Sequence, residues 1–172
     1  DRFGNLGNIL DFDNLTQENT YVLDSPILTN SQFKKFKKFF SKKVKVIDCT
    51  FDIERSLRAR IELIREEAET AVREGSTCLV LSDKNITNQK ASIPSILTVG
   101  AVHSHLVKHG LRGYCSLNVE CSDALDTHSF AILIGVGATT VNPYLAIDSI
   151  YQRFEKKLFG KSDFESLSLI HI

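Results

Sequence analysis

Short apolar runs alternate with longer segments of helical apolar spacing from Val44 to Phe154, and this alternation limits the possible folds more than any other feature. The run Cys78–Leu81 is apolar without interruption, which is typical of a strand covered on both faces. Four β–α units in tandem predict an α/β fold with a parallel sheet and right-handed crossovers. The strands are expected at 44–49, 78–81, 113–120 and 138–142, and the helices at 52–75, 94–110, 126–135 and 143–154.

Such a sheet can be open, or it can form a partial barrel like that of a TIM fold, because four units are too few to close one. In both arrangements the carboxyl ends of the strands meet along one edge, where these folds bind ligands. This expectation gives a location but identifies no chemistry. The residues expected at the edge are Asp48, Ser82, Asp83, Glu120 and Cys121.

The composition divides the chain into an extended lead-in segment at 1–30, the α/β domain at 31–160 and a tail at 161–172. The lead-in segment is polar, and Pro26 disfavours helical angles at the residue before it. We therefore expect this segment to pack on another part of the protein.

Seven lysines and no carboxylate occupy the stretch from Ser31 to Lys45. The phenylalanines at 33, 36, 39 and 40 share one helical face, so the plain prediction is a short amphipathic helix. Lysines interleaved with aromatic rings can also bind nucleic acid, which is the alternative. The whole chain carries 21 basic and 21 acidic residues, and this balance argues against a dedicated nucleic-acid binder.

No apolar run reaches the roughly 18 to 20 residues that span a bilayer, and the first residues lack the apolar core of a secretory signal. The cysteines at 49, 78, 115 and 121 lie in or beside apolar runs and form no C-x-x-C pair, which favours buried, reduced thiols. We therefore expect the cytoplasm or a plastid stroma as the compartment. The chain contains no Met, even at its first position, so we expect an excerpt from a longer protein.

Among the histidines, His128 is the strongest functional candidate, because it follows a predicted strand end close to Asp126 and Glu120. His105 and His109 are four residues apart on a predicted helix and could chelate one ion. Without a flanking Glu, however, a solvated helix face is the preferred interpretation. Gly135 and Gly137 do not fit a dinucleotide fingerprint, and we interpret them as a helix stop and a tight turn.

Several stretches, taken together and in order, resemble the central domain of the glutamate synthase large subunit. The resemblance extends from about Leu23 to about Glu155, and the ordered set is specific although no single piece is. The stretches are 23–28, 71–75, 79–84, 93–97, 101–106, 109–112, 130–138 and 143–146.

The resemblance implies a parent enzyme that converts glutamine and 2-oxoglutarate to two glutamates with a reduced electron donor. It implies an amidotransferase domain and an FMN domain with an iron–sulfur cluster as partners in the same chain, and an electron-donating subunit or ferredoxin as a further partner. It assigns no catalytic, cofactor or metal residue to this segment, which connects the two catalytic domains. The rival hypothesis is a free-standing half-barrel that binds a small molecule at Asp48, Ser82, Asp83 and Glu120.

The sequence lacks an activated nucleophile and a set of converging thiolates. We therefore expect that the chain alone is inactive and binds neither FMN nor an iron–sulfur cluster. No cysteine has the context of an activated nucleophile. Cys115 and Cys121 would lie about 20 Å apart along one strand, too far to ligate one cluster. We also expect the isolated domain to expose the apolar surface that it normally buries against its neighbours, around Phe33 to Phe40 and in the lead-in segment, and therefore to associate.

Overall fold

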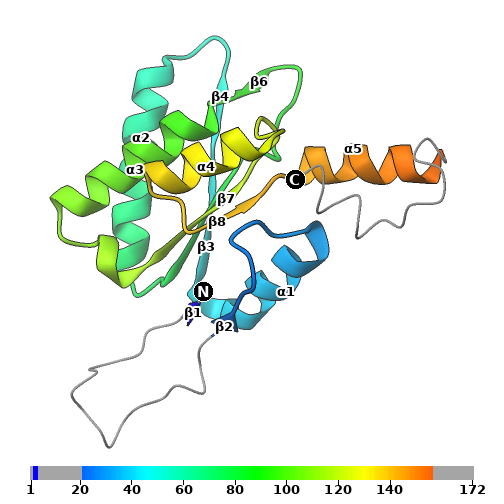
Figure 1. Cartoon of the computed structure of the whole chain (residues 1–172). Coiled ribbons are helices and arrows are strands. Elements are labelled where there is room, and N and C mark those ends of the chain that lie inside the picture. The colour runs from blue at the N-terminus through cyan, green and yellow to red at the C-terminus, as the bar shows by residue number, and fades with distance from the viewer. Residues whose placement is uncertain (1, 4–20, 157–172) are drawn as a thin grey trace, which may run out of the picture.

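The computed structural model describes residues 2–3 and 21–156 and shows an α/β domain (Figure 1). The lead-in residues 1 and 4–20 and the tail predicted at 161–172 lie outside the described residues. No helix in the described part of the chain is long and apolar enough to cross a membrane. The strands are β1 (Arg2–Phe3), β2 (Tyr21–Val22), β3 (Val44–Asp48), β4 (Thr50–Asp52), β5 (Cys78–Ser82), β6 (Lys90–Ser92), β7 (Ser116–Glu120) and β8 (Thr140–Asn142). The helices are α1 (Asn30–Phe40), α2 (Leu57–Arg73), α3 (Ser95–Lys108), α4 (Thr127–Val136) and α5 (Tyr144–Glu155), with 3-10 turns at Ser41–Lys43 and Arg112–Tyr114.

A four-stranded parallel sheet in the order β3-β5-β7-β8 forms the centre of the domain. The spatial order of these strands equals their order in the chain, as it does in a segment of a β/α barrel. A doubly wound sheet would instead reverse its strand order at a switch point. The predicted α/β fold with tandem β–α units is therefore confirmed, and the strand order fits a partial barrel.

Helices α2, α3 and α4 cover one face of this sheet (Figure 1). Alternate strand residues point into the larger core on this face, because side chains along a strand alternate between its two sides. The core gathers the apolar stripe of each helix with the strand residues Ile47, Leu79, Leu81, Leu117, Val119 and Val141.

The first helix covers the opposite face of the sheet (Figure 1). Phe33 and Phe36 of α1 are buried in a second core with Cys78 and Val80 of β5. Thr29 begins the helix with a capping box in which its side chain accepts from Gln32. The predicted amphipathic helix is confirmed, but the expected exposure is wrong for Phe33 and Phe36, because their rings cover a sheet face that no other described helix covers.

Residues 26–28 run beside the last strand, β8. Ile27 forms a parallel bridge with Val141, and the backbone N–H of Leu28 donates to the Val141 carbonyl at 2.8 Å. The N–H of Val141 donates in turn to the Pro26 carbonyl at 2.9 Å. Residues 26–28 of the lead-in segment thus occupy the outer edge of β8.

The sequence pattern misses a short antiparallel ribbon formed by β4 and β6. Strands β4 and β6 pair outside the four-stranded sheet, whereas the sequence predicts a helix from residue 52 and no strand near residue 90. Asp52 belongs to β4, and its carboxylate accepts from the N–H of Glu54 in a local turn. Helix α2 therefore begins at Leu57, with Ser56 as its cap.

One glycine fixes the turn between α4 and β8. Gly137 ends α4 with φ of 124°, a backbone conformation that favours glycine, so the predicted helix stop lies at this residue, whereas Gly135 is still inside the helix. Its carbonyl accepts from the Arg112 guanidinium, which also contacts Nδ1 of His103 at 3.2 Å. A Cβ at position 137 would overlap the His103 ring.

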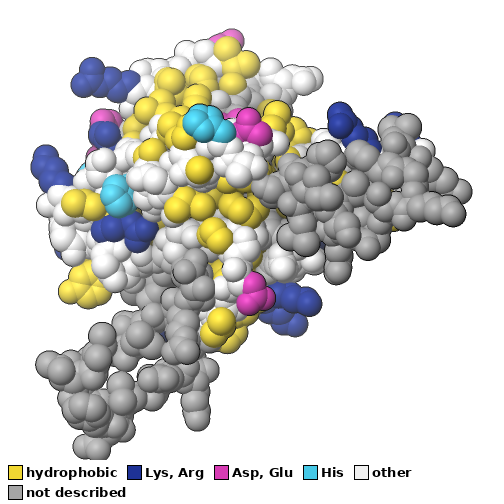
Figure 2. All heavy atoms as spheres, in the orientation of Figure 1, with side chains coloured by type: hydrophobic (Ala, Val, Ile, Leu, Met, Phe, Trp, Pro, Cys, Tyr) yellow, Lys and Arg dark blue, Asp and Glu magenta, His cyan; other side chains and the backbone are white. Residues whose placement is uncertain are grey.

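Several large apolar side chains remain on the surface of the helical face. Figure 2 shows hydrophobic side chains gathered over the middle of this side of the molecule, with most Lys and Arg side chains toward its edges. Helix α4 is apolar on all sides, yet among its residues only Phe130 and Leu133 are buried. A helix that is apolar all round is typical of one buried in a larger protein.

We predict that Phe36→Ala lowers the free energy of unfolding by about 3–5 kcal/mol, because it removes a fully buried ring from the second core. Phe39→Ala is the matched control in the same helix, since Phe39 is 46% exposed, and we expect a change below about 1 kcal/mol. Urea denaturation of both variants measures the difference. Equal losses would contradict the placement of α1 on the sheet.

We predict that Gly137→Ala lowers the free energy of unfolding by about 2 kcal/mol or more, because the new Cβ meets His103 and the backbone angle becomes strained. Gly135→Ala is the control two residues away, where a Cβ meets no atom within 4 Å. Thermal melting followed by circular dichroism should show a lower midpoint for the first variant alone.

Candidate functional site

The carboxyl ends of the strands align four polar residues in one row, of which the sequence predicts Asp48, Ser82 and Glu120 but not Asn142. Asp48, Ser82, Glu120 and Asn142 are consecutive register partners across β3, β5, β7 and β8. In-register partners of a parallel sheet point to the same face, so the row lies on the face that α1 covers. Asp83 and Cys121 follow directly in the chain.

Glu120 is the centre of this row. Its side chain is 4% exposed, and Oε1 accepts from Nζ of Lys37 at 3.1 Å and from Nζ of Lys84 at 2.9 Å. The hydroxyl of Ser82 donates to Oε2 at 2.8 Å. Burial raises the pKa of Glu120, but the hydrogen bonds from these three side chains outweigh it, so the pKa is lower than its ordinary value.

The two aspartates of the edge face other partners. Asp48 accepts from the N–H and the hydroxyl of Thr50 at 3.0 and 2.8 Å, which forms a local turn. Asp83 accepts from the N–H and the hydroxyl of Ser122 at 2.9 and 2.6 Å. Tyr144 lies close by, and burial together with the charge of Asp83 raises the pKa of its phenol to about 12. The four residues of the rival binding hypothesis thus meet at one edge, where Ser82 bonds to Glu120 while Asp48 and Asp83 have partners of their own.

The chemical consequence is a Glu120 carboxylate that is held by Ser82, Lys37 and Lys84, whereas the buried Oδ1 of Asp83 has no hydrogen-bond partner among the described residues. Helix α1 places Lys37 where a ligand of such a fold would bind, and Lys84 completes the pairing of the Glu120 carboxylate. Nζ of Lys84 also lies 4.9 Å from the centre of the Tyr144 ring. This arrangement is an internal ion cluster that joins α1 to the sheet.

His128 is exposed on the first turn of α4. The sequence predicts that it lies close to both Asp126 and Glu120. It contributes to a lower pKa of Asp126, after the larger effect of the hydrogen bonds from Ser129. The partners of Glu120 are the two lysines and Ser82 described above. The proximity of His128 to Asp126 is therefore confirmed, whereas Glu120 belongs to another cluster.

All four cysteines are free and buried, as predicted. Burial raises the pKa of Cys78 and Cys121 to about 12 and raises that of Cys49 and Cys115 as well. Thiols with raised pKa values are poor nucleophiles at neutral pH. In the described part of the chain, no three cysteine sulfurs gather as a cluster site would need.

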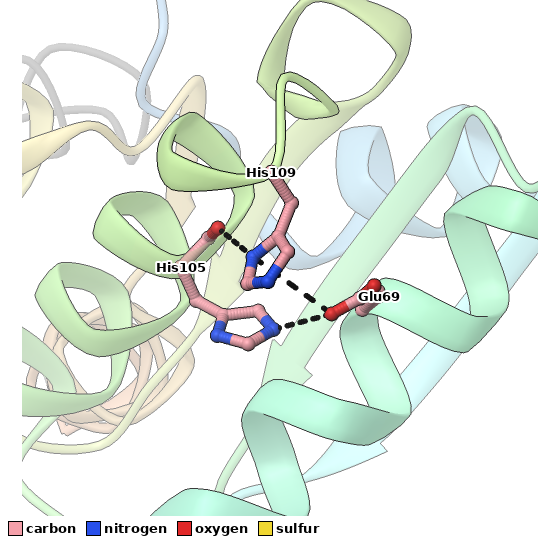
Figure 3. A group of neighbouring side chains, drawn as sticks. All are labelled: Glu69, His105 and His109. Carbon is pink, nitrogen blue, oxygen red and sulfur yellow. Dashed lines mark hydrogen bonds and ion pairs between the residues drawn. The ribbon is translucent and has the colours of Figure 1, made fainter.

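A second group of titratable side chains lies between α2 and α3 (Figure 3). Nε2 of His105 is 2.7 Å from Oε2 of Glu69, and Nδ1 of His109 is 3.9 Å from the same oxygen. The two imidazole rings lie with their centres 4.3 Å apart. The expectation of a solvated histidine face is thus wrong for His105, whose side chain is 19% exposed and faces α2.

Sequence spacing alone could not find this group. Glu69 lies 36 residues before His105, and no flanking motif connects them. The signal that exists is topological, because consecutive helices of tandem β–α units pack side by side on the sheet. His103, two residues from His105, faces Arg112 instead, as the angular spacing predicts.

Comparison with known proteins agrees with the fold and with the ordered sequence stretches. The family described as the glutamate synthase central domain matches residues 1–169. The chain belongs to this family.

Relatives with different electron donors in their names share the domain. The chain is 46% identical over 167 residues to the glutamate synthase [NADPH] large chain of Azospirillum brasilense, which covers 95% of this chain and 11% of the relative. It is 38% identical to the chloroplastic ferredoxin-dependent glutamate synthase of Spinacia oleracea, over 87% of this chain and 10% of the relative. It is also 38% identical to the glutamate synthase [NADH] of Schizosaccharomyces pombe, over 86% of this chain and 7% of the relative. The chain thus spans about a tenth of the length of these curated relatives.

We predict that Glu120→Gln lowers the free energy of unfolding of this glutamate synthase central domain by about 2 kcal/mol at pH 7, because charged hydrogen bonds are lost. The folded-state pKa of Glu120 lies below its ordinary value of 4.5, so the carboxylate stabilises the fold above about pH 4.5. This contribution disappears as the pH falls through the folded-state pKa. The difference in the free energy of unfolding between wild type and Glu120→Gln should therefore become smaller at acid pH.

Denaturation curves at several pH values between neutral and acid check this prediction. Glu62→Gln is the control, because Glu62 is 52% exposed and pairs with Arg65 on the surface of α2. Such a surface pair is worth little, so we expect a change below about 1 kcal/mol. A gap for Glu120→Gln that stays constant into acid would contradict the role given to the carboxylate.

Proposed function

We propose that this domain connects the catalytic domains of a glutamate synthase and serves as a scaffold between them. The observation that supports this most directly is the family match over residues 1–169. The matching region makes up only 7–11% of the length of the relatives, so the domain is a small part of each of them. The folded unit is the α/β domain at 31–160, with a lead-in segment at 1–30 and a tail at 161–172.

The parent enzyme converts glutamine and 2-oxoglutarate to two glutamates with a reduced electron donor. FMN and an iron–sulfur cluster supply its redox chemistry in neighbouring domains. The described residues of this chain do not fit these groups, because their thiols are buried and have raised pKa values. At the strand ends the Glu120 carboxylate is also occupied by Ser82, Lys37 and Lys84, which leaves it no oxygen for a ligand.

Exposed apolar surface supports a role in joining domains. Ile134 of α4 is 37% exposed and Leu125 just before the helix is 60% exposed, although α4 is apolar on all sides. A shallow groove between α2 and α3 is lined in part by Leu57, Ile61 and Leu97. Surfaces of this kind mark contacts with other protein segments.

The partners of this domain are the amidotransferase and FMN-binding domains of the same chain. The electron donor is an electron-donating subunit or ferredoxin that acts on other parts of the parent. Names with NADPH, NADH and ferredoxin all occur among relatives of similar identity, which supports a donor site elsewhere. The compartment is the cytoplasm or a plastid stroma.

The flanking reading frame tests the proposal most cheaply. An amidotransferase sequence upstream and an FMN barrel downstream are the expected result, while stop codons close to both ends would support the free-standing binder. The purified chain alone should be colourless and inactive with glutamine and 2-oxoglutarate. A yellow or brown preparation with stoichiometric FMN or iron would overturn the proposal.

A pair of variants in the parent enzyme tests the scaffold role itself. Ile134→Asp places a charge on the apolar outer side of α4, and we expect less glutamate formed for each glutamine hydrolysed. Leu63→Asp is the control, because Leu63 is 55% exposed on α2, whose amphipathic pattern leaves that side to solvent. An equal ratio of glutamate formed to glutamine hydrolysed in Ile134→Asp and wild type would contradict a domain contact at α4.

A further inference from the structure

Two neighbouring helices bring three side chains with metal-binding atoms together. Helix α3 supplies His105 and His109, one turn apart on the same side, and α2 supplies Glu69 (Figure 3). One donor atom from each residue lies within 4.8 Å of the other two. Within the described part of the chain, no other group of three or more His, Cys, Asp or Glu residues brings its donor atoms this close together.

The two carboxylate oxygens of Glu69 have different partners. Its Oε1 accepts from the Arg73 guanidinium, with Nε at 2.9 Å and a terminal nitrogen at 2.8 Å. Its Oε2 lies 2.7 Å from Nε2 of His105 and 3.9 Å from Nδ1 of His109. Arg73 therefore holds Oε1 of Glu69 and leaves Oε2 directed at the two histidines.

His109 has the support that metal-binding histidines usually have. Its Nδ1 lies 2.8 Å from the backbone carbonyl of His105, so Nδ1–H donates to that oxygen. In this tautomer Nε2 carries the free lone pair that a metal ion needs. A hydrogen bond from the second ring nitrogen to a backbone carbonyl fixes the tautomer and orientation of a ligating histidine.

We propose that Glu69, His105 and His109 form a binding site for one Zn²⁺ ion that links α2 to α3. Two imidazole nitrogens and one carboxylate oxygen are a frequent three-residue set for this ion, with water as the fourth ligand. Ligand bonds of about 2.0–2.2 Å in a tetrahedron place neighbouring donors about 3.3 Å apart. One donor atom of each of the three residues already lies within 4.8 Å of the other two. The side chains of His105 and His109 are 19% and 34% exposed, which leaves a path for the ion and its water.

The chemistry of the donors sets the class of metal. Imidazole favours Zn²⁺, Cu²⁺ and Ni²⁺ over Mg²⁺ and Ca²⁺, which prefer oxygen ligands. The bound ion would cross-link the helices of two successive β–α units. This link would stabilise the contact on the sheet face that α2 and α3 share, which is separate from the ion cluster at Glu120.

Titration of the 172-residue chain with Zn²⁺ in competition with a chromophoric chelator tests the site. We expect one ion per wild-type chain with micromolar or tighter affinity. His109→Gln and Glu69→Gln should each weaken binding at least about tenfold. Zn²⁺ should also raise the melting temperature of the wild type by a few degrees but not that of His109→Gln, while Mg²⁺ should leave both unchanged.

The remaining histidines provide controls. The chain has five histidines, so His128→Gln and His171→Gln report any binding outside the site, and both should keep wild-type affinity. Melting in the presence of a chelator shows whether His109→Gln is folded, and His105→Gln provides a second variant if it is not. Wild-type affinity in His109→Gln and Glu69→Gln, an equal loss in His128→Gln, or no binding at micromolar Zn²⁺ would overturn the proposal.

Discussion

The strand β5 must be covered on both faces, and most of the structure follows from this requirement. Every residue from Cys78 to Ser82 is buried, so apolar groups must pack above and below the strand. Helices α2, α3 and α4 cover one side in the usual manner of β–α units. The other side would line the interior of a complete barrel, but here α1 fills it with Phe33 and Phe36. The same helix brings Lys37 to Glu120, so the packing of α1 also closes the edge at which such folds bind ligands.

Local patterns are sufficient to predict the sheet and its helices. The uninterrupted apolar run of β5, the spacing of apolar residues in α2 and the helix stop at Gly137 each depend on neighbours close in sequence. The short pairing of β4 with β6 escapes such patterns, because Thr50 and Ser92 meet across about 40 residues. The sequence also shows that α1 is amphipathic but cannot show which surface its apolar side covers.

The candidate sites show the same limit more clearly. The row from Asp48 to Asn142 is largely predictable, because parallel strands in register place their last residues together. The lysines that neutralise Glu120 come from α1 and from the loop after β5, so their convergence depends on tertiary packing. Glu69 meets His105 for the same reason, through the contact of two helices that share a sheet face.

The pairing of residues 26–28 with β8 also determines how the domain bears mechanical load. The two segments run parallel, and they are joined by the bonds between Leu28, Val141 and Pro26 and by the Asn142 amide, which donates to the Leu28 carbonyl at 2.9 Å. Tension that pulls the chain backward at Pro26 and forward at Asn142 slides these segments past each other. All of the bonds then resist together in shear instead of opening one after another. Force transmitted between Pro26 and Asn142 would bypass α1 to α4 and the larger core, because residues 26–28 and β8 hold each other directly.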